Sequence, residues 1–227
     1  AHRVTLQGLE PKTRYQYRIR AAASEKGSAI SDAFELDNAL NFAVARVPDA
    51  PSPYGADAAS RTCVQTAEQI LSASGVTRGY CLVLNCGDGQ LAYELAKRSE
   101  LIIFGVENDH ARIAKARALL GKTGVYGSRI TLHQANTLDS LPFPKSFANL
   151  LVVGAPLAAG SLPGTAAQVL SLLQPATGVA CLGPLRAATQ TEATNHVTQW
   201  LGETKARWEL LRSEAGSWVR VQRDLPP

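Results

Sequence analysis

The chain has 227 residues, of which 45% are hydrophobic and 19% are charged, a composition that is ordinary for a globular protein. This length is enough for one sizeable α/β domain with a small appendage. The net charge of +4 is spread without a long run of Lys and Arg, which argues against nucleic acid as a partner, and no apolar stretch reaches the length (about 18 residues) of a membrane span.

The cysteines and histidines do not form a metal-binding pattern. Cys63, Cys81, Cys86 and Cys181 show no C-x-x-C spacing, and the four His are far apart, so we expect no zinc site. The cysteines do not indicate a cellular compartment. The chain begins at Ala1 and contains no Met, from which we expect a processed or excised piece of a longer protein.

The first part of the chain has the period-two alternation of β-strands. We expect strands over residues 2–9, 13–22 and 33–39. Three strands bury too little surface to be stable alone. We therefore expect either that the rest of a sheet precedes them in a parent chain, or that they pack against the domain that follows.

A short motif in this region resembles a known fold. Leu9, Pro11, Thr13 and Tyr15 form the string L-x-P-x-T-x-Y, which is similar to the end of a fibronectin type III domain. The resemblance implies that the Tyr hydrogen-bonds back to the chain a few residues upstream. We expect residues 1–47 to be a fragment of such a domain, serving either as a docking module or as a structural remnant.

Residues 46–58, RVPDAPSPYGADA, contain three prolines and a glycine, which is the composition of a linker. We therefore divide the chain into a β segment over 1–47, a linker over 48–58 and a second domain over 59–227.

In the second domain, apolar runs typical of buried strands alternate with segments of helical spacing. Ser60 and Asp109 are expected to begin two of the helices, and Gly75 and Gly121 to follow their ends. The expected strands are 80–84, 101–107, 129–133, 147–154 and 178–183, and the expected helices are 60–74, 91–98, 109–121 and 165–173.

Strands that are apolar throughout and separated by helices indicate a parallel sheet that is covered on both faces. Residues 206–223 differ, because they read as two strands joined by a short turn. The predicted fold class is therefore α/β: a Rossmann-like, mostly parallel sheet with helices on both faces and a C-terminal antiparallel hairpin, plus a small N-terminal β segment.

A glycine-bearing turn joins the first apolar run to a helical segment in the string LVLNCGDGQLAYELA, residues 82–96. In a parallel sheet the ligand crevice lies at the carboxyl ends of the strands, and Gly87 and Gly89 fall there. Glycine permits positive φ and lets the backbone approach a ligand closely, while the following helix offers unpaired N–H groups. Alone, this pattern is a weak signal and is also typical of a purely structural turn.

Glu107 strengthens the ligand hypothesis, because it ends the next apolar run about 20 residues after Gly87. An acid at this distance is placed to accept hydrogen bonds from both hydroxyls of a ribose. The alternative is that Glu107 only caps the helix that begins near Asp109. The order of strand, glycine turn, helix, strand and acid favours a nucleoside-containing ligand.

Two nucleoside cofactors are compatible with the turn. Residues 87–92, GDGQLA, align with the dinucleotide pattern G-x-G-x-x-A, so NAD stays an alternative. Three features favour S-adenosylmethionine instead. A helix precedes the first strand, the polar Asn85 stands two positions before the first glycine, and an antiparallel hairpin closes the sheet.

The string LVLNCGDGQLAYELA, together with IIFGVENDHARIAKARALL, resembles motifs I and II of class I S-adenosylmethionine-dependent methyltransferases, and the regions 138–153 and 169–183 resemble the family's fourth and fifth strands. The match covers roughly residues 60–223. The resemblance implies that the glycine-bearing turn, called the bend below, holds the methionine end of the cofactor. The residues of the bend are Asn85, Cys86, Gly87, Asp88 and Gly89.

The resemblance also assigns the nucleoside end of the cofactor. It implies that Glu107 binds the ribose and that Asn108 lies at the adenine edge. Either Asn136 or Asp139, after the third strand, is placed near the adenine amino group.

Two positions depart from the family's usual residues. Asn85 stands where Asp or Glu is usual, so it keeps an acceptor oxygen but loses a charge. Because charged hydrogen bonds are worth about 1.5–3 kcal/mol and neutral ones about 0.5–1.5 kcal/mol, we expect binding to weaken by roughly 1 kcal/mol, or near fivefold. The neighbouring Asp88 can compensate. Asn149 stands where Asp is frequent.

The segment 152–164, VVGAPLAAGSLPG, contains no acid, His, Lys or Tyr, and no residue can be named as catalytic. The roof of the site can come only from the regions 59–66, 154–166 and 185–204. Three hypotheses remain. They are methyl transfer from S-adenosylmethionine to an unidentified acceptor, a degenerate methyltransferase-like scaffold in a multidomain protein, and an NAD-binding oxidoreductase domain.

Overall fold

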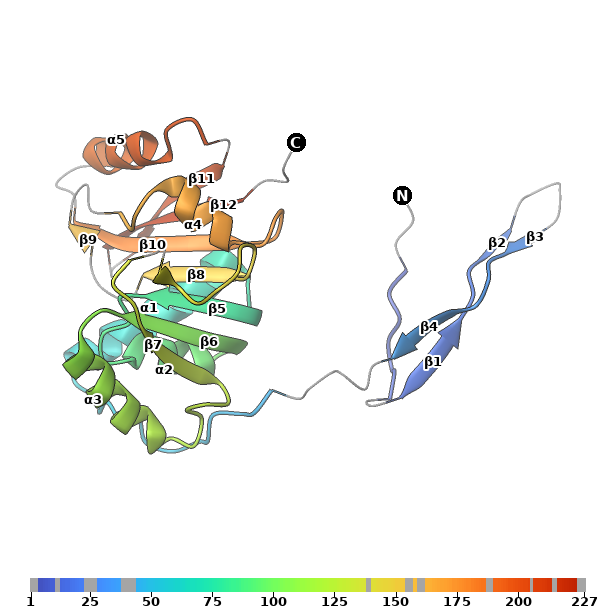
Figure 1. Cartoon of the computed structure of the whole chain (residues 1–227), viewed down its shortest axis with the longest axis horizontal. Helices are drawn as coiled ribbons and strands as arrows, with labels where there is room; N and C mark the ends of the chain where they lie inside the picture. The colour runs from blue at the N-terminus through green and yellow to red at the C-terminus, as the bar shows by residue number, and fades with distance from the viewer. Residues whose placement is uncertain are drawn as a thin grey trace. The chain divides into compact units, whose positions relative to one another are not determined.

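The computed structural model describes residues 4–10, 13–22, 28–37, 44–137, 140–153, 157–158, 162–186, 190–204, 206–213 and 216–223. The chain divides into two compact units, Ala1–Ala43 and Val44–Pro227. Short strands make up the first unit, and the second contains one large sheet with its helices (Figure 1).

The N-terminal unit is built from two short antiparallel pairs. Strand β1 (Arg14–Tyr17) pairs with β4 (Phe34–Asp37), and β2 (Arg20–Ala22) pairs with β3 (Ser28–Ile30). The prediction of a strand over residues 2–9 is wrong for its described part, because residues 4–10 are in no strand. No described strand lies beside them to take up their backbone N–H and C=O groups, which is what a strand requires.

Tyr15 makes a local hydrogen bond in this unit. Its hydroxyl oxygen accepts from the backbone N–H of Glu10 at 2.6 Å. The unit has little core of its own, since Val4, Leu6 and Ile30 are 82%, 57% and 57% exposed. The resemblance to a fibronectin type III domain stays a prediction.

The second unit contains one sheet of mostly parallel strands. Its order is β11-β12-β10-β8-β5-β6-β7, with the short β9 beside β10. Neighbours from β10 to β7 are parallel, and the last two strands form an antiparallel hairpin. The strands are β5 (Arg78–Leu84), β6 (Glu100–Glu107), β7 (Ile130–Gln134), β8 (Leu150–Val153), β9 (Leu157–Ala158), β10 (Val179–Arg186), β11 (Arg207–Ser213) and β12 (Gly216–Gln222).

Helices cover both faces of this sheet (Figure 1). They are α1 (Ala58–Ser74), α2 (Gln90–Lys97), α3 (His110–Gly121), α4 (Ala166–Leu172) and α5 (Gln190–Leu201). Among the described helices, none combines the length and the hydropathy that a membrane crossing requires.

The core has two layers because side chains alternate across each strand. On β5, Cys81 and Val83 pack with α1, α2 and α3, whereas Leu82 and Leu84 pack with α4 and α5. All four side chains are at most 3% exposed. This is the arrangement that continuous apolar strands predict, and the predicted fold class is confirmed.

Helix ends follow the sequence signals with two differences. Helix α1 is capped by Asp57 rather than by Ser60, since an Asp57 carboxylate oxygen accepts from the Ser60 N–H at 2.8 Å. Gly75 ends this helix in the left-handed conformation, with φ of 67°, and Asp109 caps α3, both as expected. Gly121 is the last residue of α3 and not the one after it.

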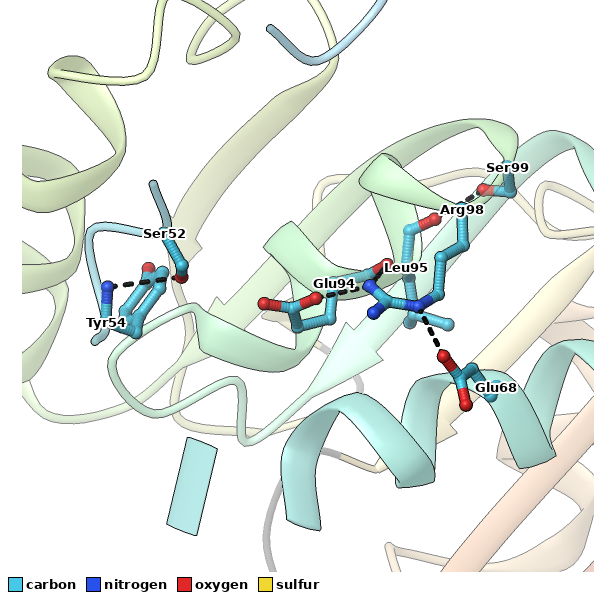
Figure 2. Close-up of polar contacts among 7 residues, drawn as sticks. All are labelled: Ser52, Tyr54, Glu68, Glu94, Leu95, Arg98 and Ser99. Carbon is cyan, nitrogen blue, oxygen red and sulfur yellow. Dashed lines mark hydrogen bonds and ion pairs between the residues drawn. The ribbon is translucent and has the colours of Figure 1, made fainter. Parts of the chain in front are cut away.

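A charged side chain joins α1 to α2. Arg98, just after α2, contacts Glu68 of α1 at 3.1 Å and also bonds Glu94 of α2 (Figure 2). The Ser99 hydroxyl donates to the Leu95 carbonyl at 2.6 Å and satisfies the end of α2. The Arg98–Glu68 contact links α1 to the helix that follows the glycine bend.

The limits 1–47, 48–58 and 59–227 stay a prediction, but residues 44–57 already contact the α/β unit. The guanidinium of Arg129 donates to the Ala45 carbonyl, and the side chains of Val47 and Tyr54 pack on the core beneath α2 and α3. The proline-rich segment therefore runs along the surface of the α/β unit and contacts it through Ala45, Val47 and Tyr54.

Candidate functional site

The bend between β5 and α2 has an unusual backbone. Asn85, Gly87 and Gly89 all have positive φ, at 50°, 59° and 83°. Asn is one of the few residues with a side chain that tolerates this region. Asn at position 85 therefore suits the backbone of the bend.

The two glycines of the bend have different surroundings. A Cβ on Gly87 would meet nothing within 4 Å, whereas a Cβ on Gly89 would lie 3.0 Å from the Leu120 side chain and 3.2 Å from the Tyr54 hydroxyl. Gly89 is thus required for packing. The free space beside Gly87 is available to a ligand, because a bare backbone allows close approach.

Glu107 at the end of β6 contacts the bend directly. One carboxylate oxygen accepts from the Gly87 N–H at 2.9 Å, and the other accepts from the N–H groups of Asn108 and Asp109 at 3.1 and 3.2 Å. The residue is only 3% exposed. A carboxylate has about four acceptor positions, so one position remains, on the oxygen that faces Gly87.

Tyr54 supports the bend from outside the predicted domain. Its hydroxyl donates to the backbone carbonyl of Asp88 at 2.9 Å, and its ring lies 5.8 Å from that of Tyr93 in α2. Burial, followed by the nearby Asp88 charge, raises the pKa of Tyr54 well above its usual value, so the hydroxyl keeps its proton. The Asp88 side chain accepts from the N–H of Gln90, the first residue of α2, at 3.1 Å.

A first cavity, the Asn136 cavity, lies on the side of the bend that faces α4. Its volume is about 410 Å³, and its wall includes Leu84, Asn85, Val106, Asn136 and Thr137. Asn85, Asn136 and Asn108 are all exposed, so their side chains are accessible. Asp139, the sequence alternative to Asn136, lies outside the described residues.

A second cavity, the Trp218 cavity, lies on the side of the bend that faces α1. Its volume is about 450 Å³, and its wall includes Thr62, Cys63, Cys86, Gly87 and Trp218. Burial raises the pKa of both Cys63 and Cys86 to about 12, so both thiols are protonated near neutral pH. Both cavities fall within the range of small-molecule sites, about 300–1,000 Å³.

Asn149 is far from this site. It precedes β8 at the amino edge of the sheet, where its side chain accepts from the Tyr80 N–H at 2.9 Å and donates to Gln174 at 2.7 Å. A Cβ on Gly79 would lie only 2.2 Å from the Asn149 side-chain oxygen, so the two residues fit together. Asn149 therefore has a structural role at this edge.

The comparisons with known proteins identify a fold. No protein-family model matches the sequence, and no curated protein matches it either. By contrast, 976 chains among the solved structures match. The likeness of this chain to known proteins is therefore one of structure.

Three solved structures illustrate this likeness. A protein of Methanococcus maripaludis assigned as an S-adenosyl-L-methionine-dependent methyltransferase is 15% identical with a TM-score of 0.56, covering 74% of this chain and 88% of its own. A SAM-dependent methyltransferase from Aquifex aeolicus is 12% identical with a TM-score of 0.54, covering 72% and 92%. Geranyl diphosphate methyltransferase in complex with SAM is 12% identical with a TM-score of 0.53, covering 72% and 85%. The chain has the fold of these methyltransferases.

The structure adds three side chains that sequence reasoning missed. Tyr54 lies in the proline-rich segment, Gln90 begins α2, and Trp218 lies in β12. The aromatic residue inside a supposed linker was the one available signal. Across the residues that the structure describes, no group of three or more His, Cys, Asp or Glu could hold a metal ion.

Proposed function

We propose that residues 44–227 bind S-adenosylmethionine across the bend at 85–89 and transfer its methyl group to an acceptor. The observation that carries this proposal is the contact between Glu107 and the Gly87 N–H at 2.9 Å, at the carboxyl edge of the sheet. An acid and a bare-backbone bend are thus adjacent where ligands of such folds bind. The likeness to methyltransferase structures supports the same reading.

The residues around the bend fit this cofactor. The free space beside Gly87 admits the ribose, Glu107 accepts a ribose hydroxyl at its one remaining acceptor position, and Asn136 hydrogen-bonds the adenine from the wall of the Asn136 cavity. The methionine end lies on the other side of the bend, where Asp88 attracts its ammonium group. When bound, the cofactor supplies an electrophilic methyl group, and the chain has to align it with a nucleophile.

A methyltransferase-like scaffold is the second candidate. It is favoured by the three backbone N–H groups that Glu107 already accepts, because they leave only one acceptor position for a ligand. An NAD-linked oxidoreductase is less favoured, because dinucleotide domains have the all-parallel order 3-2-1-4-5-6. Here the sheet ends in antiparallel strands.

A thermal-shift panel with S-adenosylmethionine, S-adenosylhomocysteine and NADH separates these candidates. A ligand at about 100 times its Kd adds roughly 2.7 kcal/mol, which raises the Tm of a chain of this size by about 5–10 °C. We expect a shift with the first two ligands only. A shift with NADH alone supports the oxidoreductase, and no shift with any ligand supports the scaffold.

We also propose that the N-terminal unit is the end of a fibronectin type III-like domain in a multidomain protein. The bond from the Glu10 N–H to the Tyr15 hydroxyl supports this. Removing the hydroxyl with Tyr15→Phe should speed proteolytic cleavage within residues 1–43 of the full chain and leave 44–227 intact. Unchanged cleavage would contradict the proposal.

A further inference from the structure

The Trp218 cavity contains two buried donors that lack a partner. Trp218 is 5% exposed, and within the described part of the chain neither its indole Nε1–H nor the side-chain Nε2 of Gln90 has a hydrogen-bond partner. Both residues belong to the wall of this one cavity. Buried donors in proteins are nearly always paired, because an unpaired one costs stability. The two donors therefore indicate a ligand group that accepts hydrogen bonds.

The rest of the wall is mostly apolar and neutral. Leu91, Val153 and Pro184 contribute apolar surface, and the thiols of Cys63 and Cys86 keep their protons. A ligand that fits this wall has an apolar body with one polar end.

The described residues of the wall also offer no buried general base. Asp88 is the one carboxylate among them, and this side chain is exposed to water and accepts from the N–H of Gln90. An acceptor that has to lose a proton during methylation therefore finds no buried base among the described residues of this wall.

We propose that the Trp218 cavity binds the carboxylate of a small, otherwise apolar methyl acceptor, with Gln90 Nε2–H and Trp218 Nε1–H donating to its oxygens. This inference rests on the proposed function. One carboxylate oxygen forms a bond to the methyl carbon while the sulfur–methyl bond breaks, and that electron pair stays on sulfur. The products are a methyl ester and S-adenosylhomocysteine, and no proton moves.

Other acceptor classes fit less well. An alcohol needs a base to be deprotonated, and an ammonium group has no lone pair for the two donors to reach. A carboxylate is already ionised at neutral pH. Its burial is offset by the positive sulfonium beside it, and both charges disappear in the reaction. The water-exposed charge of Asp88 repels it only weakly, because solvent screens it.

The test compares three probes that share a ring: benzoate, benzyl alcohol and benzylamine. Binding to the full chain is measured by NMR and calorimetry with S-adenosylhomocysteine present. We expect benzoate to bind in preference to the other two. Trp218→Phe and Gln90→Leu should each weaken benzoate binding about tenfold, as expected for a lost hydrogen bond to a charged group, while S-adenosylhomocysteine still binds Trp218→Phe.

Two control variants lie outside the cavity. Trp208→Phe removes an indole on the other face of the sheet. Gln69→Leu removes an unpartnered oxygen in a smaller cavity of about 240 Å³ that Trp218 also borders. Neither should change benzoate binding. A loss in Gln69→Leu that matches the loss in Trp218→Phe would overturn the assignment to the Trp218 cavity.

A second pair of ligands distinguishes the acceptor from the cofactor's own carboxylate. The compound 5′-methylthioadenosine lacks the amino-acid part of S-adenosylhomocysteine. If benzoate binds equally well in the presence of either compound, the cavity is an acceptor site. If S-adenosylhomocysteine blocks benzoate and 5′-methylthioadenosine does not, the proposal is overturned. Equal binding of the three ring probes overturns it as well. If S-adenosylhomocysteine does not bind at all, the proposed function fails, and Trp218-dependent benzoate binding then still identifies a carboxylate site.

Discussion

At the amino edge of the parallel sheet, buried polar groups are paired within the chain. Arg129 is 2% exposed, and its guanidinium donates to the backbone carbonyls of Ala45, Ala96, Ser99 and Leu101. The side-chain amide of Asn149 is also fully paired, because its oxygen accepts from the Tyr80 N–H and its nitrogen donates to Gln174. A cavity of about 440 Å³ also lies at this edge, and Arg129 forms part of its wall.

At the carboxyl edge, similar groups are left unpaired. Gln90 Nε2 and Trp218 Nε1 are buried without a partner in the described chain, and the backbone of Gly87 borders free space. Two cavities lie on either side of the bend. We infer from this contrast that the amino edge serves stability and that the carboxyl edge serves the proposed binding, and variants at the two edges should separate these effects.

The largest expected effect on stability is at the amino edge. Arg129→Met removes the donor for four backbone carbonyls and should lower the free energy of unfolding by about 3 kcal/mol, because buried carbonyls lose their partners. Urea unfolding measures this loss. Affinity for S-adenosylhomocysteine, measured below the unfolding transition, should be unchanged, and a selective loss of affinity would break the contrast.

Glu107→Ala comes next and should affect both properties. The substitution leaves three backbone N–H groups without their acceptor, which costs about 2–3 kcal/mol of unfolding free energy. It also removes the proposed ribose contact. Because stability and affinity should both fall in Glu107→Ala, this variant does not by itself show where the ligand binds. An unchanged free energy of unfolding in this variant, measured with urea, would contradict the three hydrogen bonds to Glu107.

Tyr54→Phe should have a moderate effect. It removes the hydrogen bond to the Asp88 carbonyl and should cost about 1 kcal/mol of unfolding free energy. The less constrained bend should bind S-adenosylhomocysteine several-fold more weakly in calorimetry. Tyr80→Phe, near the amino edge, is the matched control and should leave affinity unchanged. Equal affinities for both variants would mean that the proline-rich segment does not support the site.

Asn136→Ala should have the smallest effect on stability. The side chain is exposed, so the unfolding free energy should change by less than about 0.5 kcal/mol. Loss of one neutral hydrogen bond to adenine should weaken S-adenosylhomocysteine about fivefold. Undiminished affinity would move the adenine contact to another residue, with Asn108 as the next candidate.

Much of the fold could be predicted from the sequence, because continuous apolar strands and helical spacing are local signals. The central strands β5, β6, β7, β8 and β10, the helices α1 to α4, the caps at Asp109 and Gly75, and the C-terminal hairpin all follow from them, whereas β3, β9 and α5 were not predicted. The strand predicted over 2–9 failed because strand formation depends on a partner, which local alternation does not reveal.

The site was less accessible to sequence reasoning. The adjacency of Gly87 and Glu107 followed from spacing along parallel strands. The three bonds that Glu107 accepts from backbone N–H groups depend on how the loop after β6 turns, and no residue pattern encodes them. The contribution of Trp218 depends on strand order, which brings β12 beside β10 and near the bend.

The most direct test of the binding claim uses two glycines with similar positive φ. Gly87 and Gly75 have φ of 59° and 67°, and a Cβ on either would meet nothing within 4 Å. Alanine at either position should therefore cost a similar strain energy, about 1–2 kcal/mol. Titration calorimetry with S-adenosylhomocysteine should show a loss of affinity of more than about tenfold in Gly87→Ala and none in Gly75→Ala. Equal affinities for the two variants would contradict the account, because the free space at the bend would then hold no ligand.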